Sequence, residues 1–152
     1  MGKGGEMLTC YDVANYFLTK GEEAGDPISN LKLQKLAYYA QGFSLALLQK
    51  PLFEEKIEAW MHGPVVPDLY HAFKEHGTNS LPVPADIDFS RYSADELELL
   101  GEVFNVYGQF SAWKLRNMSH EEAPWQSVYV EGEASKEIPH GVMAEFFKTL
   151  VH

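Results

Sequence analysis

The sequence predicts a mainly α-helical fold, a single compact helical bundle with at most a small two-stranded β element near residues 52–61. Three observations lead to this prediction. Apolar residues recur at intervals of three and four along much of the chain, the spacing that places them on one face of a helix. Residues that cap helices precede several of these stretches. The alternation of apolar and polar residues that is typical of a strand occurs over one short segment only.

Two helices are predicted in the first third of the chain. The first begins after Thr9, where TCYD resembles a capping box with Asp in place of Glu, and ends within residues 21–27. The second and longest begins after Ser29, which can cap it, and stops before Pro51. Its predicted apolar face carries Leu33, Leu36, Ala37, Ala40, Phe43 and Leu47.

The segment AWMHGPVVPDLYHAF at 59–73 combines the end of a strand pattern with a sharp turn. Gly63 can adopt a positive φ, and Pro64 restricts the turn. Pro67 suits the first turn of a helix, where a missing N–H is no loss. The stretch therefore either holds a catalytic histidine, His62, in a strained turn or forms a structural corner that packs Trp60 and starts a helix. The apolar members of the preceding strand pattern are Ile57, Ala59 and Met61.

Further helices are predicted in the second half of the chain. A capping box at 93–96 begins one that ends at Gly108. A shorter helix begins at Ser111, and Pro124 can open another. Pro139 starts the terminal helix.

Length and composition predict how these elements are organised. A chain of 152 residues, 45% hydrophobic and 22% charged, is typical of one globular domain. Residues 1–8 are expected to form a loose or disordered tail, and residues 9–152 a single helical domain. The tail lacks the apolar segment of a secretion signal, and the single cysteine suits a reducing compartment, so a cytoplasmic location is expected.

The charge balance argues against two classes of partner. Twelve basic and 22 acidic residues give a net charge of −10, whereas nucleic-acid binding needs a basic face. No apolar run approaches the roughly 20 residues that span a bilayer, so no membrane partner is expected. Acidic residues gather at 54–58, 95–102, 121–122 and 131–137. Such runs are either solvated faces or surfaces complementary to a basic protein.

Motifs for enzyme chemistry are missing from the sequence. It contains no G-x-S-x-G nucleophile elbow, no phosphate loop and no dinucleotide fingerprint. His71 and His76 lie five residues apart, unlike the i, i+4 pair of a zinc protease helix. We therefore expect no catalytic residue, no metal and no cofactor. An enzyme would need His62, His120 and Glu121 or Glu122 to converge in one pocket.

Three stretches resemble a known family. KLQKLAYYAQG at 32–42, EAWMHGPVVPDLYHAF at 58–73 and SHEEAPW at 119–125 are similar to the Panacea domain. This SocA-like antitoxin domain is also found in GepA-type phage-associated proteins. The resemblance extends from about Tyr11 to about Phe147, in the order of the family.

The resemblance implies an antitoxin, not an enzyme. Such a protein binds and neutralises a toxin encoded nearby by direct protein contact, and many members lie in prophages or other mobile elements. We expect an acidic and aromatic face to make the contact. The candidate motif and partner-binding residues are Lys35, Tyr39, Trp60, His62, Gly63, Pro64, His120 and Trp125.

Other interpretations remain open at this point. The protein could be a proteolytic adaptor that delivers a partner to an ATP-dependent protease, an enzyme that uses His62 and His120, or a DNA-binding regulator. With a structural corner at 63–64, the two histidines are expected to bind the backbone or each other. Six aromatic residues either pack in the core or share an exposed patch: Tyr38, Tyr39, Trp60, Tyr70, Trp113 and Trp125.

Overall fold

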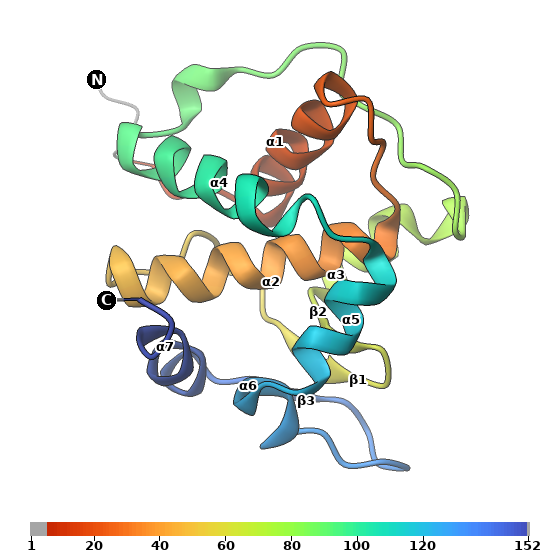
Figure 1. Ribbon diagram of the computed structural model, residues 1–152, viewed down its shortest axis with the longest axis vertical. Coiled ribbons are helices and arrows are strands. Elements are labelled where there is room, and N and C mark those ends of the chain that lie inside the picture. Colours follow the sequence, from red (N-terminus) through yellow and green to blue (C-terminus); the bar gives the residue numbers. More distant parts are fainter. Residues whose placement is uncertain (1–5, 152) are drawn as a thin grey trace.

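The computed structural model describes residues 6–151, and its fold is mainly helical, as predicted. Helix α2 crosses the middle of the molecule, with α1 and α4 on one side and α6 and α7 on the other (Figure 1). The 3-10 turn η2 directly continues α3, and a second 3-10 turn, η3, lies in the loop before α4. The helices are α1 (Cys10–Glu23), α2 (Asn30–Leu47), α3 (Pro67–Phe73), η2 (Lys74–His76), η3 (Phe89–Arg91), α4 (Ala94–Tyr107), α5 (Ala112–His120), α6 (Ala123–Gln126) and α7 (His140–Lys148).

The predicted caps form as expected. Thr9 and Asp12 form a capping box at the start of α1, and Ser93 and Glu96 form another at the start of α4. The Ser29 hydroxyl accepts a hydrogen bond from the third residue of α2, and Ser111 does the same for α5. These side chains satisfy backbone N–H groups that have no partner within the helix, which is why helices begin where the sequence predicts.

Helix α2 is buried far beyond the single apolar face that its spacing predicts. Its polar residues Gln34 and Gln41 are also buried, at 1% and 0% exposure. Each amide serves a neighbouring backbone: Gln41 accepts from the Leu52 N–H and donates to the Phe53 carbonyl, while Gln34 accepts from the Val66 N–H. Polar residues at these positions therefore belong to the core because they satisfy loops that pack against α2.

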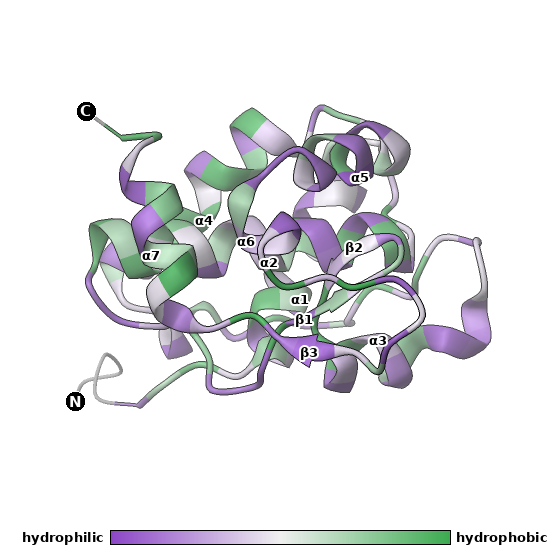
Figure 2. Ribbon diagram, turned by 90° about the horizontal axis from the view of Figure 1, so that it is seen from below, coloured by the Kyte–Doolittle hydropathy of each residue, from purple (hydrophilic) through white to green (hydrophobic). Residues whose placement is uncertain are grey.

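The β element is larger than predicted. Strands β1 (Glu58–Trp60) and β2 (Gly63–Val65) form a hairpin, but only β1 lies in the predicted region, because β2 occupies the segment predicted as a Gly-Pro corner. A third strand, β3 (Lys136–Glu137), pairs with the other edge of β1. Strand β3 is short, exposed and hydrophilic (Figure 2), so it has no apolar period to predict it. Met61 also departs from the predicted pattern: Ile57 and Ala59 are buried, whereas Met61 lies in the turn with 63% of its surface exposed.

Two predictions concern the ends of the chain and the membrane. Residues 1–5 of the predicted tail lie outside the described residues, while Leu8 is 1% exposed and packs in the core. Among residues 6–151, no helix has both the length and the apolar character to cross a membrane.

Candidate functional site

Gly63 and Pro64, predicted as a turn, instead begin strand β2, which pairs with β1 and packs directly against α2 and α5, while the turn itself is at residues 61–62. Gly63 has a φ of +107°, in the region that favours glycine. A Cβ atom at this position would lie 2.9 Å from Lys35 Cε and 2.9 Å from Ser119 Oγ. Glycine is therefore required twice, by its backbone conformation and by the two side chains pressed against it.

Lys35 is the buried cation of this junction. It is 0% exposed, and its Nζ donates a hydrogen bond to the Pro64 carbonyl over 3.0 Å. It forms no ion pair with any carboxylate in residues 6–151. Burial, helped by the nearby Arg116 cation, lowers its pKa to about 7. The lysine therefore links α2 to Pro64 by a hydrogen bond, and burial makes its ammonium group lose its proton more readily than that of an exposed lysine.

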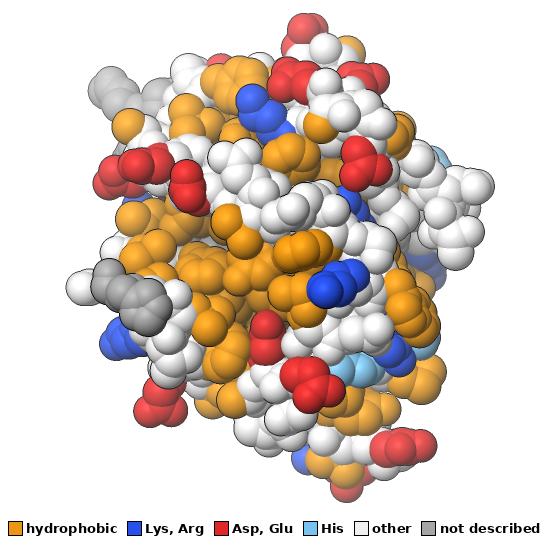
Figure 3. Space-filling view, viewed as in Figure 1, with side chains coloured by type: hydrophobic (Ala, Val, Ile, Leu, Met, Phe, Trp, Pro, Cys, Tyr) orange, Lys and Arg blue, Asp and Glu red, His pale blue; other side chains and the backbone are white. Residues whose placement is uncertain are grey.

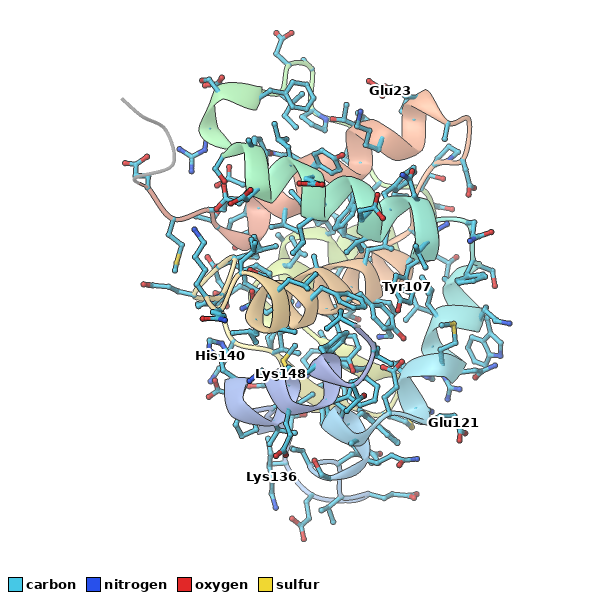
Figure 4. The ribbon with its side chains drawn as sticks, turned by 60° about the vertical axis from the view of Figure 1, so that its left-hand side comes forward. Glu23, Tyr107, Glu121, Lys136, His140 and Lys148 are labelled. Carbon is cyan, nitrogen blue, oxygen red and sulfur yellow. The ribbon has the colours of Figure 1, made fainter. Side chains whose placement is uncertain are left out.

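A half-buried carboxylate meets α2 about one turn beyond Lys35, on the same face of the helix, because Tyr38 and Tyr39 lie three and four residues after the lysine. Glu122 accepts hydrogen bonds from the hydroxyls of Tyr38 and Tyr39, at 2.8 and 2.9 Å. Burial raises its pKa to about 7, while the two tyrosine hydrogen bonds oppose that shift. Tyr39 also stacks on Tyr107, with ring centroids 4.1 Å apart. Figure 4 places Tyr107 at the end of α4 that lies beside α2.

An aromatic stack joins the end of α5 to the hairpin. His120 stacks on Trp125, with centroids 4.1 Å apart, and Trp125 stacks on Tyr129. The indole Nε1 of Trp125 donates to the Trp60 carbonyl over 2.7 Å. Burial lowers the pKa of His120, and Arg116 adds to the effect. A neutral ring is therefore favoured at this position.

His62 corrects one expectation. It binds neither the backbone nor His120 by a hydrogen bond: its Nδ1 accepts from Arg116 Nε over 3.1 Å. The Arg116 guanidinium also lies over the exposed Trp113 ring, 4.4 Å from its centroid. His62 is thus part of an exposed cation–π cluster and not of the buried junction.

The side chains that an acid–base site would use make separate contacts. Glu122 is held by the tyrosines, His120 by the aromatic stack and His62 by Arg116. Glu121 is exposed and points away from the junction in Figure 4. Within the described residues, no group of three or more His, Cys, Asp or Glu side chains is placed to hold a metal ion.

Most of the candidate motif residues meet at this junction, and most are covered. Lys35, Tyr39, Gly63 and Pro64 are buried, and His62 is the one exposed member of the eight. Of the six aromatic residues that could have formed a shared exposed patch, Trp113 alone is exposed, at 56%. Tyr38 and Tyr39 are buried in the core, while Trp60, Tyr70 and Trp125 are half-buried, so most of the expected aromatic face is at least partly covered.

The structure also reveals an apolar groove that sequence reasoning missed. The α4–α7 groove, as we name it, has a volume of about 590 Å³. Figure 3 shows hydrophobic side chains gathered across this face. One feature of the sequence pointed to this groove, because the acidic run at 95–102 includes three residues that line it, Asp95, Glu98 and Glu102. The lining residues are Phe43, Leu47, Leu48, Asp95, Glu98, Leu99, Glu102, Val103, Val106, Tyr107, Leu150 and Val151.

Comparison with known proteins gives one consistent result. The profile of the family described as antitoxin SocA-like, Panacea domain, matches residues 33–126. The chain is 34% identical over 127 residues to Antitoxin SocA of Caulobacter vibrioides (strain NA1000 / CB15N), covering 76% of this chain and 68% of that protein. No solved structure matches at a significant level.

Proposed function

Because the chain belongs to the SocA-like antitoxin (Panacea domain) family, we propose that it binds a toxin protein and neutralises it by direct contact. The similarity to Antitoxin SocA over most of the chain is the observation that carries this proposal. The proposed toxin is encoded by a neighbouring gene, and the pair is proposed to belong to a prophage or another mobile element.

The geometry of the motif residues supports a binding role without catalysis. Among the residues that could have served as acid or base, Lys35 donates to the backbone and Glu122 accepts from two tyrosines, while the buried Nε2 of His120 has no hydrogen-bond partner within the described residues. Such a junction stabilises a scaffold, and recognition is left to the surface. The surface has a strong negative charge, −10 for the whole chain, which favours encounter with a basic partner.

Co-expression with the product of the adjacent reading frame tests the proposal. We expect growth arrest by that product to be relieved, and the two proteins to co-purify. An unrelated protein of similar net charge, expressed at the same level, is the control for non-specific electrostatic binding. Persistent arrest with no complex would contradict the proposal.

The abundance of the toxin distinguishes contact from delivery to a protease. Neutralisation by contact predicts that toxin levels hold steady while growth recovers. A fall in toxin level that depends on an ATP-dependent protease would instead establish the adaptor function.

A further inference from the structure

We propose that the α4–α7 groove is a docking site for an amphipathic helix of a partner protein, with apolar residues along one face and Lys or Arg along one edge. The identification of that partner as the toxin rests on the proposed function. The chemistry of the helix is inferred from the groove alone.

The floor of the groove is apolar and open to solvent. Leu47 at the end of α2, Val106 on α4 and Leu150 after α7 are 53%, 47% and 40% exposed. All three line the same groove, together with the buried Leu99 and Val103. Clustered apolar side chains of this kind are typical of surfaces that bind a partner, whereas scattered ones are not.

One edge of the groove is acidic. Asp95, Glu98 and Glu102 lie three and four residues apart on α4, so they form a row on one side of the helix. Figure 3 shows acidic side chains along the α4 side of the hydrophobic face. None of the three forms an ion pair within the described residues. Three unpaired carboxylates beside an apolar floor are complementary to a basic edge.

Helix α4 presents the acidic row and the apolar row side by side. Leu99, Val103 and Val106 repeat at four and three, in parallel with the acidic residues. From residue 95 to 106 the helix rises about 16 Å, so a partner helix of about three turns would match its length. Helices of this kind bind in grooves through apolar residues at i, i+3 or i+4, and i+7.

A second copy of the chain fits the groove less well. Its net charge of −10 opposes self-association, and two copies that met through α4 would bring their acidic rows together. Like charges across an interface disfavour binding. The groove therefore favours a basic partner over a second copy of this chain.

The first test uses a designed peptide, so it does not depend on the toxin. The probe is a fluorescent peptide of about 12 residues, cross-linked to hold it helical, with Leu on one face and Lys along one edge. A peptide of the same composition with the residue order scrambled is the control. We expect anisotropy titrations to show at least tenfold tighter binding of the patterned peptide at moderate salt.

Matched variants locate the binding site. Val106→Asp places a charge on the groove floor, and Val130→Asp makes the same change at a similarly exposed residue outside the groove. We expect Val106→Asp to weaken peptide binding at least tenfold and Val130→Asp less than twofold. Thermal unfolding verifies that both variants are folded.

Charge reversal tests the acidic edge. Glu98→Lys combined with Glu102→Lys should weaken binding at least tenfold at low salt and much less at high salt, because salt screens exposed charges. Glu22→Lys with Glu54→Lys makes the same change in net charge on exposed residues that do not line the groove. Equal effects of the two pairs would overturn the basic-edge assignment.

The outcomes separate this inference from the proposed function. Equal binding of the patterned and scrambled peptides, or equal loss in Val106→Asp and Val130→Asp, overturns the groove as a docking site. Full neutralisation of the toxin by Val106→Asp, with wild-type neutralisation intact, also overturns it but leaves the proposed function standing. Groove-dependent peptide binding without neutralisation of any neighbouring gene product supports the groove and contradicts the function.

Discussion

Replacing Gly63 by alanine tests the claim that glycine is required where strand β2 packs against α2 and α5. The substitution adds two penalties. A non-glycine residue at positive φ costs about 1–3 kcal/mol. The new methyl carbon would lie 2.9 Å from both Lys35 Cε and Ser119 Oγ, which is closer than a Cβ atom normally approaches a neighbouring atom. Relieving such overpacking costs about 1–3 kcal/mol.

We therefore expect Gly63→Ala to lower the free energy of unfolding by about 2–6 kcal/mol. With a urea slope of roughly 2 kcal/mol per M for a chain of this size, the unfolding midpoint should fall by about 1–3 M. Urea titrations followed by tryptophan fluorescence and by circular dichroism measure the shift, and coincident transitions justify a two-state treatment.

Gly25→Ala is the matched control. Gly25 also has a positive φ, +74°, but a Cβ atom there would have nothing within 4 Å. It should therefore show the backbone penalty alone, and Gly63→Ala should be the more destabilising of the two by at least 1 kcal/mol. Equal losses in the two variants would refute the claim that contact with the buried lysine and serine demands glycine.

Three further predictions concern the buried junction. The pKa of Lys35 is near 7 in the folded chain and 10.5 ordinarily, so the folded chain binds fewer protons at this site between these values. The free energy of unfolding should therefore rise from pH 7 to 9.5, and Lys35→Met should flatten this rise in urea titrations. The pKa of Glu122 is raised to about 7 from 4.5, so the folded chain binds more protons at this site between pH 4.5 and 7. The free energy of unfolding should therefore fall as pH rises through this range, and Glu122→Gln should remove most of that slope. Trp125→Phe removes the hydrogen bond to the Trp60 carbonyl and should lower the free energy of unfolding by about 1–3 kcal/mol, whereas Trp113→Phe, at an exposed ring, should change it by less than about 0.5 kcal/mol; comparable changes would contradict the junction.

Local chemistry explains which parts of the fold could be predicted from sequence. Helix starts depend on residues a few positions apart, so the caps at Thr9, Ser29, Ser93 and Ser111 were recognisable. Strand β3 depends on pairing with β1 across more than 70 residues, and its exposed Lys-Glu pair has no pattern of its own. Long-range pairing leaves no local signal in such a short strand.

The site was predictable in part for the same reason. The motif residues were recognised by resemblance, and the positive φ of Gly63 by its residue type. Burial is a property of the assembled molecule, so the pattern could not tell that Trp113 is exposed while Tyr39 is enclosed. The groove combines residues near the end of α2, residues of α4 and the two residues 150–151 after α7, and its shape exists only after these segments pack.

The docking of α7 has a consequence for how long the protein survives in a cell. Phe147 fills the space above Gly42, where α2 leaves no room for even a methyl group. Release of this single nine-residue helix would uncover the aromatic centre of the molecule and present an entry point for degradation. A ligand that bridges α4 and residues 150–151 would contact the segment that directly follows this helix, so occupancy of the groove should oppose the release of α7.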